Sequence, residues 1–452
     1  MDISTEALVA ISPIDGRYKA NCHSLSNYFS EFALIKFRVE VEIKYLLYLA
    51  KEKVGFAGEL RSEDEQPIRL IYQSFSMADA QAIKVLEATT NHDVKAVEYF
   101  IRERLQDIGL QWLSEMVHFG LTSQDINNTA IPLSIKRFMA EEYLPQVNSL
   151  ISLLRGLANA NAAQPMLART HGQAASPTTL GKELDVFAYR LAKVQARIAA
   201  MPIEGKFGGA TGNFNAHVVA FPQVDWPTFA TKFLKEELGL ERQTLTTQIE
   251  NYDTLGSLFD SCSRLNTILI DLCRDIWAYV SLDYFKQTVK EGEVGSSAMP
   301  HKVNPIDFEN AEGNLGIAIA LFNHFSNKLP ISRLQRDLSD STVLRNIGVP
   351  FAHTILAIKS IERGLGKLTT NGAKIGADLE ANYIVIAEAI QSILRREGVP
   401  NGYEILKNAT RGKGSFTAAS MAEVIDQFPV SDLVRAEMKA ITPANYIGVL
   451  GQ

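Results

Sequence analysis

Apolar residues recur along much of this chain at alternating steps of three and four positions, the period of an amphipathic α-helix. Two long stripes of this kind cover residues 258–280 and 180–198. Ser176 and Pro177 precede the second stripe and suit the N-cap and the first residue of its helix. Similar patterns predict helices near 30–50, 142–162, 308–326 and 341–364. Core packing accounts for these stripes, so they predict a fold and no chemistry.

Two glycine-containing segments interrupt the helical pattern, at residues 205–217 and 290–305, and extended patterns are few and short. Long helices with this spacing favour a bundle. Residues 364–376 provide a joint before a last helical region. The pattern therefore predicts a mainly α fold of three helical domains. These are an N-terminal domain over 1–111, a central long-helix bundle over 112–365 that includes the second loop, and a C-terminal domain over 366–452.

The bulk composition is typical of a globular protein. The 452 residues are 46% apolar and 21% charged, and no uncharged apolar run reaches the roughly 18 residues that a membrane span needs. The first residues, MDISTEALVAISP, lack the basic start and long apolar stretch of a signal peptide. Three scattered cysteines indicate neither a disulfide framework nor a zinc cluster. We therefore expect a reducing, cytoplasmic location and no membrane.

Charge and motifs narrow the range of ligands. The net charge is −6 with the signs interspersed, which argues against a nucleic-acid partner, although a buried basic site for an anionic small molecule is compatible with it. The chain has no GxxxxGKS/T phosphate loop, no GxGxxG that opens a helix, no HExxH and no CxxC. A phosphate group would therefore be bound by scattered Arg, Ser and His side chains.

Four polar clusters are more than a helical core requires. They are residues 91–93 (NHD), 118–125 (HFGLTSQD), 169–173 (RTHGQ) and 295–305 (GSSAMPHKVNP). Each has a structural alternative when it is taken alone. A lone histidine is usually packed or solvated, the sequence Thr-Ser-Gln-Asp can cap a helix, and a Gly-Ser loop can be a linker.

The cluster at 295–305 resembles the signature loop of the fumarase/aspartase superfamily, GSSxMPxKxNP, and the Thr-Ser and Thr-His blocks precede it in the expected order and spacing. The resemblance extends from SPIDGRY at 12–18 to TPANY at 442–446. His301 after Met-Pro, Thr-His-Gly-Gln at 170–173, and the segments 91–98 and 335–346 are similar to one branch, the adenylosuccinate lyase family in its longer bacterial form.

The resemblance implies an enzyme that eliminates fumarate from adenylosuccinate, giving AMP, and from the succinylcarboxamide ribotide SAICAR, giving AICAR. It implies a nucleotide substrate, no metal, no organic cofactor, and a homotetramer with a core of central bundles and with active sites shared between subunits. Alternatives are another lyase of the superfamily, a non-enzymatic helical scaffold, and a nucleotide-binding regulator. The presence of His171, Ser296, Lys302 and Asn304 argues against the scaffold.

The implied reaction removes a weakly acidic proton from the β-carbon of a succinyl group and expels the purine amine. The carbanion-like state then needs cations and hydrogen-bond donors at the adjacent carboxylate. Lys302 and Asn304 suit this task, and Thr122 and Ser123 can donate to the succinyl carboxylates. The resemblance adds Gln248 to this group.

An acid must protonate the leaving nitrogen, and a histidine suits this step because its pKa lies near the working pH. The resemblance gives this role to His171, and Glu309 is the kind of carboxylate that can hold a catalytic imidazole protonated and oriented. It gives the role of base to Ser296, with Ser297 as the alternative. A serine can act so only where backbone donors and Lys302 stabilise its alkoxide in a closed site.

The remaining site residues follow from the family pattern alone. Five residues are implied around the nucleotide: Arg17, Tyr18, Arg336, Ser341 and Arg345. Three more are implied at the substrate: Asn91, His92 and Asp93. His118 is expected in a supporting position. Without the resemblance, Arg17 and Arg345 are ordinary surface arginines.

Overall fold

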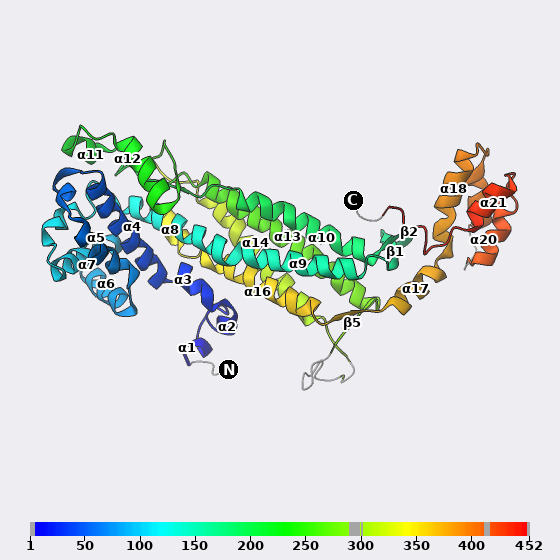
Figure 1. Ribbon diagram of the computed structural model, residues 1–452. Helices are drawn as coiled ribbons and strands as arrows, with labels where there is room; N and C mark the ends of the chain where they lie inside the picture. The colour runs from blue at the N-terminus through cyan, green and yellow to red at the C-terminus, as the bar shows by residue number, and fades with distance from the viewer. Residues whose placement is uncertain (1–4, 289–298, 300–301, 411–415, 450–452) are drawn as a thin grey trace. The chain divides into compact units, whose positions relative to one another are not determined.

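The computed structural model describes residues 5–288, 299, 302–410 and 416–449. Helices dominate the described chain, and the strands form three two-stranded sheets (Figure 1). The prediction of a mainly α fold is confirmed. The chain divides into two compact units, each built from three segments: unit 1 comprises 1–147, 194–267 and 313–357, and unit 2 comprises 148–193, 268–312 and 358–452. The division into three domains at 111 and 365 stays a prediction.

Five long helices contribute residues to both units. They are α9 (Leu144–Ala160), α10 (Leu180–Ala199), α13 (Asp253–Ser281), α14 (Ile306–Lys328) and α16 (Gly348–Leu365). The predicted helices over 180–198 and 258–280 are α10 and α13. The segment 341–364, expected as one helix, contains two, because α15 (Ser339–Leu344) ends before α16 begins. Pro350, in the first turn of α16, has no N–H to bond the carbonyl of residue 346, so it favours the break.

Unit 1 holds most of the short helices of the N-terminal half, and its elements pack around α4. The helices are α1 (Thr5–Leu8), α2 (Lys19–Cys22), α3 (Ser26–Phe29), α4 (Glu31–Lys51), α5 (Ser62–Gln73), α6 (Met77–Thr90), α7 (Asp93–Asp107), α8 (Ser123–Phe138), α11 (Asn215–Ala220) and α12 (Trp226–Phe233). A parallel pair joins β3 (Glu204–Gly205) to β4 (Glu241–Arg242).

Helix α4 runs through the core of unit 1. Within residues 35–49, all but Lys36 and Lys44 are buried, and the apolar ones join one cluster with side chains of α7, α8 and α12. The buried residues include three charged ones, Arg38, Glu40 and Glu42. A buried charge is costly without a partner. We therefore expect each of these three side chains to pair with an opposite charge.

Unit 2 carries the β1–β2 hairpin and the C-terminal helices. Strands β1 (Pro165–Thr170) and β2 (Gln173–Thr179) are antiparallel, as are β5 (Phe285–Gln287) and β6 (Leu368–Thr370). The helices α17 (Gly372–Ala381), α18 (Ala387–Arg396), α19 (Gly402–Thr410), α20 (Ala418–Ile425) and α21 (Asp432–Lys439) follow. A separate apolar cluster joins residues of α18 to α21, so this region has a core of its own.

The predicted N-cap at Ser176 is wrong, because Ser176 and Pro177 lie in β2 and α10 begins at Leu180. The register shifts between Met166 and Ala168, so Ser176 and Pro177 face a single residue of β1 in a β-bulge. A proline has no N–H to donate to the ladder and is accommodated at such an irregularity.

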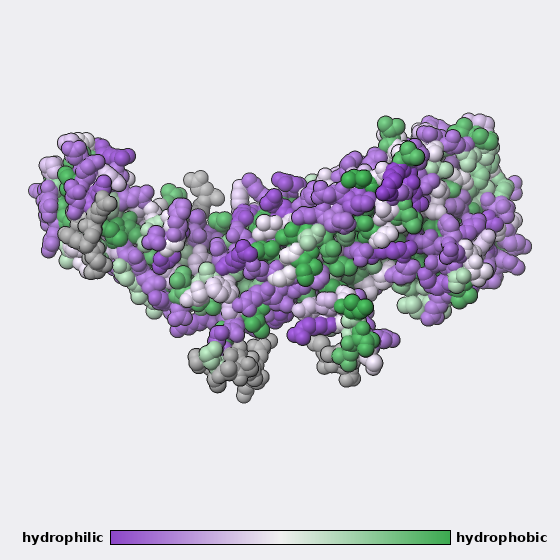
Figure 2. All heavy atoms as spheres, turned by 180° about the vertical axis from the view of Figure 1, so that it is seen from behind, coloured by the Kyte–Doolittle hydropathy of each residue, from purple (hydrophilic) through white to green (hydrophobic). Residues whose placement is uncertain are grey.

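No helix among the described residues is long and apolar enough to cross a membrane. The same part of the chain holds no group of three His, Cys, Asp or Glu side chains arranged to bind a metal ion. Its surface carries apolar side chains, and Figure 2 shows several of them on the segment around α1, where Leu8, Val9 and Ile11 are exposed.

Candidate active site

A cavity of about 290 Å³ in unit 1 brings together residues of α4, α7, α8 and α15. Three of the predicted site residues line it, Asp93, Ser341 and Arg345. The remaining lining residues are Tyr28, Phe29, Ser30, Glu31, Leu34, Arg38, Gln124, Asn127, Ile131, Ser134, Leu344 and Ile347.

The Asn-His-Asp cluster forms the junction between α6 and α7. Asn91 ends α6 in the left-handed conformation, with φ of 53°, which asparagine tolerates better than most residues. His92 is the N-cap of α7, and its Nδ1 accepts the backbone N–H of Lys95 at 3.1 Å. Because Nδ1 is an acceptor, the neutral ring carries its proton on Nε2. This proton can be donated to a ligand.

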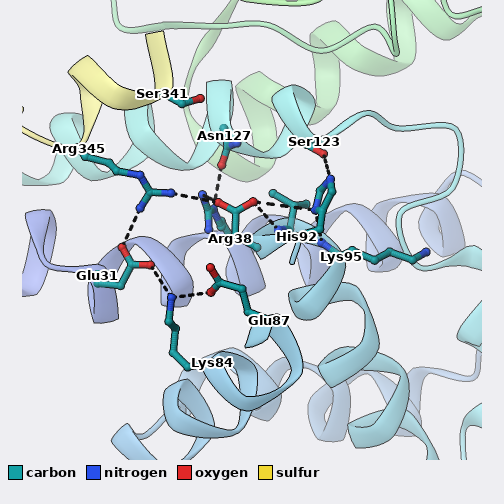
Figure 3. Close-up of polar contacts among 12 residues, drawn as sticks. Glu31, Arg38, Lys84, Glu87, His92, Lys95, Ser123, Asn127, Ser341 and Arg345 are labelled. Carbon is teal, nitrogen blue, oxygen red and sulfur yellow. Dashed lines mark hydrogen bonds and ion pairs between the residues drawn. The ribbon is translucent and has the colours of Figure 1, made fainter. Parts of the chain in front are cut away.

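Two of the four predicted clusters meet here within one chain. Ser123 is the first residue of α8, and its Oγ lies 3.5 Å from Nε2 of His92 (Figure 3). The His92 side chain is half exposed, so both polar groups face solvent at the start of their helices. The exposed N–H groups of a helix start and its positive dipole end favour anions.

Asp93 is held by three donors. Its Oδ2 accepts from Arg38 Nη2 at 2.7 Å and from Arg345 Nη2 at 3.4 Å, and its Oδ1 accepts the backbone N–H of Val94 at 2.9 Å. Burial raises the pKa of Asp93, but Arg38, the Val94 N–H and Arg345 outweigh it and hold the pKa below its ordinary value. The carboxyl is therefore ionised at neutral pH.

Arg345 lies between two carboxylates on the rim of the cavity. Besides Asp93, it pairs with Glu31 at 3.1 Å, and Glu31 in turn pairs with Lys84 at 3.5 Å (Figure 3). Next to it, Arg336 donates to Ser341 Oγ at 3.0 Å and lies 3.8 Å from Asp340. Ser341 and Arg345 line the cavity, Arg336 reaches it through Ser341, and each arginine is paired with a carboxylate. We call Arg336, Ser341 and Arg345 the cationic edge of the cavity.

The Thr-Ser-Gln-Asp block caps α8 and also anchors the glycine loop. Asp125 accepts the N–H of Thr122 at 2.8 Å, Lys206 Nζ at 2.7 Å, and the N–H groups of Gly208 and Gly209. Asp125 and Lys206 have no exposed side-chain surface. Burial lowers the pKa of Lys206 although Asp125 opposes the shift. The pair therefore fixes the loop against the start of α8.

The other end of the glycine loop is held by the segment that contains Gln248. Gln248 Nε2 donates to the carbonyl of Ala210 at 3.1 Å. Gly212 has φ of +80°, and a Cβ at this position would lie 2.6 Å from the carbonyl oxygen of Thr246. Glycine is required there for both reasons. Thr122, Ser123 and Gln248, which the sequence assigns to the succinyl carboxylates, are thus tied to one loop.

His118 forms a buried ion pair with α4. Its Nδ1 lies 2.5 Å from Glu42 Oε1, and the Glu42 side chain is fully buried. Burial lowers the pKa of His118, but the carboxylates of Glu42, Glu98 and Asp125 together outweigh it, so the net shift is upward. The pair satisfies one of the buried charges on α4, which fits a supporting position. Arg17 is exposed and packs against the ring of Tyr18 at 5.9 Å, and neither residue lines the cavity.

The predicted acid lies in unit 2, on the turn between β1 and β2. His171 and Gly172 form a two-residue turn in which both φ values are positive, 52° and 75°, as a type I′ turn requires. The His171 side chain is exposed, and no described residue forms a hydrogen bond with it. Glu309 accepts instead from Trp277 Nε1 at 3.1 Å.

The signature loop lies mostly outside the described residues. Ser296, Ser297 and His301 are not described. Lys302 is exposed, with its backbone N–H bonded to the carbonyl of Met299, and Asn304 is partly buried. The structure therefore describes the predicted acid and the two predicted carbanion-stabilising residues, but not the predicted base.

Sequence reasoning assigned no role to four residues of the cavity wall, Glu31, Arg38, Gln124 and Asn127, or to Asp340, which accepts a hydrogen bond from Gln124. A signal for Arg38 was present. The run IKFRVEVEIKYLLYL at 35–49 is apolar on every face of a helix, so its charges cannot all face solvent. The amides gave no such signal, since buried Gln124 and Asn127 are explained only by their bonds to Asp340 and Arg38.

Comparison with known proteins identifies the fold and the family of this chain. Residues 16–319 match a family model described as Lyase, and residues 332–447 match one described as Adenylosuccinate lyase C-terminal. Among solved structures, 3-carboxy-cis,cis-muconate lactonizing enzyme from Pseudomonas putida is similar, with a TM-score of 0.71, 18% identity and 95% of each chain covered. The chain thus has the fold of the helical lyases.

Curated relatives show to which family of lyases the chain belongs. The chain is 55% identical to adenylosuccinate lyase of Dictyostelium discoideum over 99% of this chain and 98% of the relative. It is 47% identical to the Vibrio cholerae enzyme of that name, over 98% and 97%, and 46% identical to that of Escherichia coli strain K12, over 99% and 98%. The chain belongs to the adenylosuccinate lyase family.

Proposed function

We propose that this chain eliminates fumarate from adenylosuccinate, giving AMP, and from SAICAR, giving AICAR. The observation that carries the proposal is the match of nearly the whole chain to relatives named adenylosuccinate lyase, at 46–55% identity. The site adds chemical support. A nucleotide needs cations for its phosphate, and Arg336 and Arg345 form a cationic edge beside the cavity.

The elimination needs a base, an acid and donors for the carboxylates. Ser296 takes the proton from the β-carbon of the succinyl group, and the electron pair of that C–H bond forms the double bond of fumarate. Lys302 and Asn304 stabilise the negative charge that develops on the adjacent carboxylate. The C–N bond then breaks, and His171 gives its proton to the leaving nitrogen. The exposed imidazole of His171 is accessible to such a substrate.

The binding residues divide by the part of the substrate that they face. We assign Thr122, Ser123 and Gln248 to the succinyl carboxylates, because the loop 205–217 ties their segments together. The phosphate is assigned to Arg17, Tyr18, Arg336, Ser341 and Arg345. Asn91, His92 and Asp93 lie beside Ser123, where His92 donates through Nε2. His118 and Glu309 act as supporting residues.

These side chains supply the base, the acid and the cationic donors that the reaction demands, so we propose no metal or organic cofactor. A chelator should leave the rate unchanged. Loss of activity with chelator, restored by added zinc, would overturn this part of the proposal.

We further propose a cytoplasmic homotetramer with shared active sites. His171 has no hydrogen-bond partner among the described residues of its own chain, as expected of a side chain that completes a site in another subunit. Apolar side chains are exposed on the long helices, namely Tyr189 on α10, Trp277 on α13 and Ile317 on α14. Burial of such side chains between subunits would favour association.

The proposal is tested by fumarate release from adenylosuccinate by the purified protein, with argininosuccinate as the competing substrate. We expect release from the first and none from the second. Release from argininosuccinate alone would indicate another lyase of the superfamily. Binding of adenylosuccinate without fumarate release would indicate a regulator.

A further inference from the structure

A buried arginine lies behind the polar edge of the cavity. Arg38 on α4 exposes only 3% of its side chain, whereas Arg345 on the rim exposes 47% (Figure 3). Arg38 Nε donates to Asn127 Oδ1 at 2.8 Å, and its Nη2 donates to Asp93 Oδ2 at 2.7 Å. The rigid fork of the guanidinium thereby joins α4 to both α8 and α7. Arg345, by its exposure, is the arginine that a ligand in solution meets.

The two arginines share one carboxylate oxygen. Asp93 Oδ2 is 2.7 Å from Arg38 but 3.4 Å from Arg345. The short contact makes Arg38 the principal partner of Asp93, because a charge-assisted hydrogen bond is strongest at about 2.7–2.9 Å. The contact to Arg345 is long, so that guanidinium is only loosely held on this side. Its other partner, Glu31, lies at 3.1 Å and is exposed to solvent.

We propose that Arg38 is a positioning residue, which neutralises Asp93 and so leaves Arg345 available to the phosphate of the nucleotide. The inference rests on the proposed function, which assigns Arg345 to the phosphate. Without Arg38, Arg345 would be the one arginine or lysine among the described residues that is paired with the Asp93 carboxylate. The His92 ring, 4.0 Å away, directs to that side an Nδ1 that is already an acceptor. The carboxylate would then compete with the phosphate for the same guanidinium.

A purely structural role for Arg38 predicts a different pattern. Arg137 provides the comparison, because it also joins α8 to α4, through Glu40, with contacts of 2.9 and 2.5 Å. It lines no part of the cavity and pairs with neither Asp93 nor Arg345. Loss of Arg137 therefore removes a link between the same two helices and leaves the cationic edge intact.

The test measures the dissociation constants of AMP and adenosine by calorimetry in Arg38→Met, Asp93→Asn, the double variant, and the control Arg137→Met. We expect Arg38→Met to weaken AMP by about tenfold, the effect of one charged hydrogen bond. Adenosine, which lacks the phosphate, should bind as before. In the Asp93→Asn background the same change should cost almost nothing, because no carboxylate is left to capture Arg345.

The double variant also covers the case in which Arg38→Met does not fold, since removal of both charges of a buried pair is far milder than removal of one. Equal AMP affinities of the double variant and Asp93→Asn then support the proposal. An AMP loss in Arg38→Met no larger than in Arg137→Met, or the same loss with and without Asp93, would overturn it. Unchanged AMP binding in Arg345→Met would instead refute the assignment of Arg345 to the phosphate, and the inference with it.

Discussion

Three charged residues of the cavity wall in unit 1, Arg38, Asp93 and Arg345, are bonded to one another. His171 in unit 2, in contrast, stands exposed on a two-residue turn, and its side chain has no hydrogen-bond partner in the described chain. The wall is fixed by ion pairs such as that of buried Arg38 with the partly buried Asp93, which holds the start of α7 against α4. Besides its own backbone, the turn is held by Arg169, whose Nη1 donates to the carbonyl of Gly172 at 3.3 Å. The positive φ values of His171 and Gly172 present the imidazole at the tip of a hairpin.

This difference indicates that substrate binding and proton transfer depend on different parts of the molecule. A wall with satisfied hydrogen bonds can hold its geometry before the ligand arrives, which lowers the entropic cost of binding. An exposed imidazole gains a defined position only when another surface covers it. We therefore expect the binding edge to be complete within one chain and the acid to require a second subunit.

Ser296→Ala should have the largest effect, since it removes the proposed base. Turnover should nearly vanish while adenylosuccinate still binds, because the cationic edge in unit 1 is unchanged. Steady-state rates of fumarate release and calorimetric binding measure the two parts. Ser297→Ala is the matched control, and a dead Ser297→Ala with an active Ser296→Ala would move the base by one residue.

Loss of the acid comes next. His171→Asn should lower kcat by roughly 10²–10⁴, the usual contribution of a positioned general acid. Asparagine is chosen because Asn-Gly is the preferred pair for a type I′ turn, so the hairpin is preserved. Circular dichroism and thermal melting check that preservation. Near-normal turnover in this variant would remove His171 from the mechanism.

The glycine loop offers a test of stability. Asp125→Asn leaves Lys206 buried without its counter-charge and should lower the free energy of unfolding by about 3–5 kcal/mol. Urea titration measures this. As a control, Glu236→Gln breaks the exposed pair with Lys51 and should cost far less, because solvent screens such a pair. Equal losses in the two variants would contradict the anchoring role of Asp125.

The last prediction about stability concerns its dependence on pH. Burial raises the pKa of Glu250 from 4.5 to about 8, and its Oε1 accepts from Gln243 and from the Tyr252 N–H. The raised value means that the folded state holds a proton that the unfolded state releases. The stability contribution is therefore full below pH about 4.5 and is lost as the pH rises towards about 8.

Glu250→Gln removes that titration and keeps an oxygen acceptor. Between pH about 5 and about 8, the free energy of unfolding should fall less in the variant than in the parent. Urea titrations at the two pH values measure this difference. Parallel pH profiles for the two proteins would show that Glu250 is ionised in the folded state.

The sequence predicted the elements that periodicity defines. The stripes at 180–198 and 258–280 coincide with α10 and α13, because a buried face imposes its spacing on the residues. It failed at Ser176-Pro177, where the pattern of a helix start also fits the bulge of a hairpin. The residues at 176–177 alone cannot distinguish the two, because the bulge is set by how β2 pairs with β1.

The candidate site was likewise predicted only in part. The family resemblance predicted His92, Ser123, Ser341 and Arg345, because its motifs are recognisable blocks of sequence, and these four residues lie in or near the cavity wall. They did not give Arg38, whose role depends on contacts with residues 55 and 89 positions away, at Asp93 and Asn127. Such partners are set by the packing of α4 against α7 and α8, which single-chain patterns do not specify.

Subunit complementation tests the central claim most directly. His171→Asn and Ser296→Ala proteins are inactive alone, and the two are mixed in equal amounts, with exchange verified by co-purification of differently tagged chains. Half of the subunits then carry each intact residue, so about a quarter of the sites in closed, symmetric tetramers have both when different chains supply them. We predict recovery of about this fraction of the parental activity. No recovery despite proven exchange, or a monomer by light scattering, would contradict shared sites.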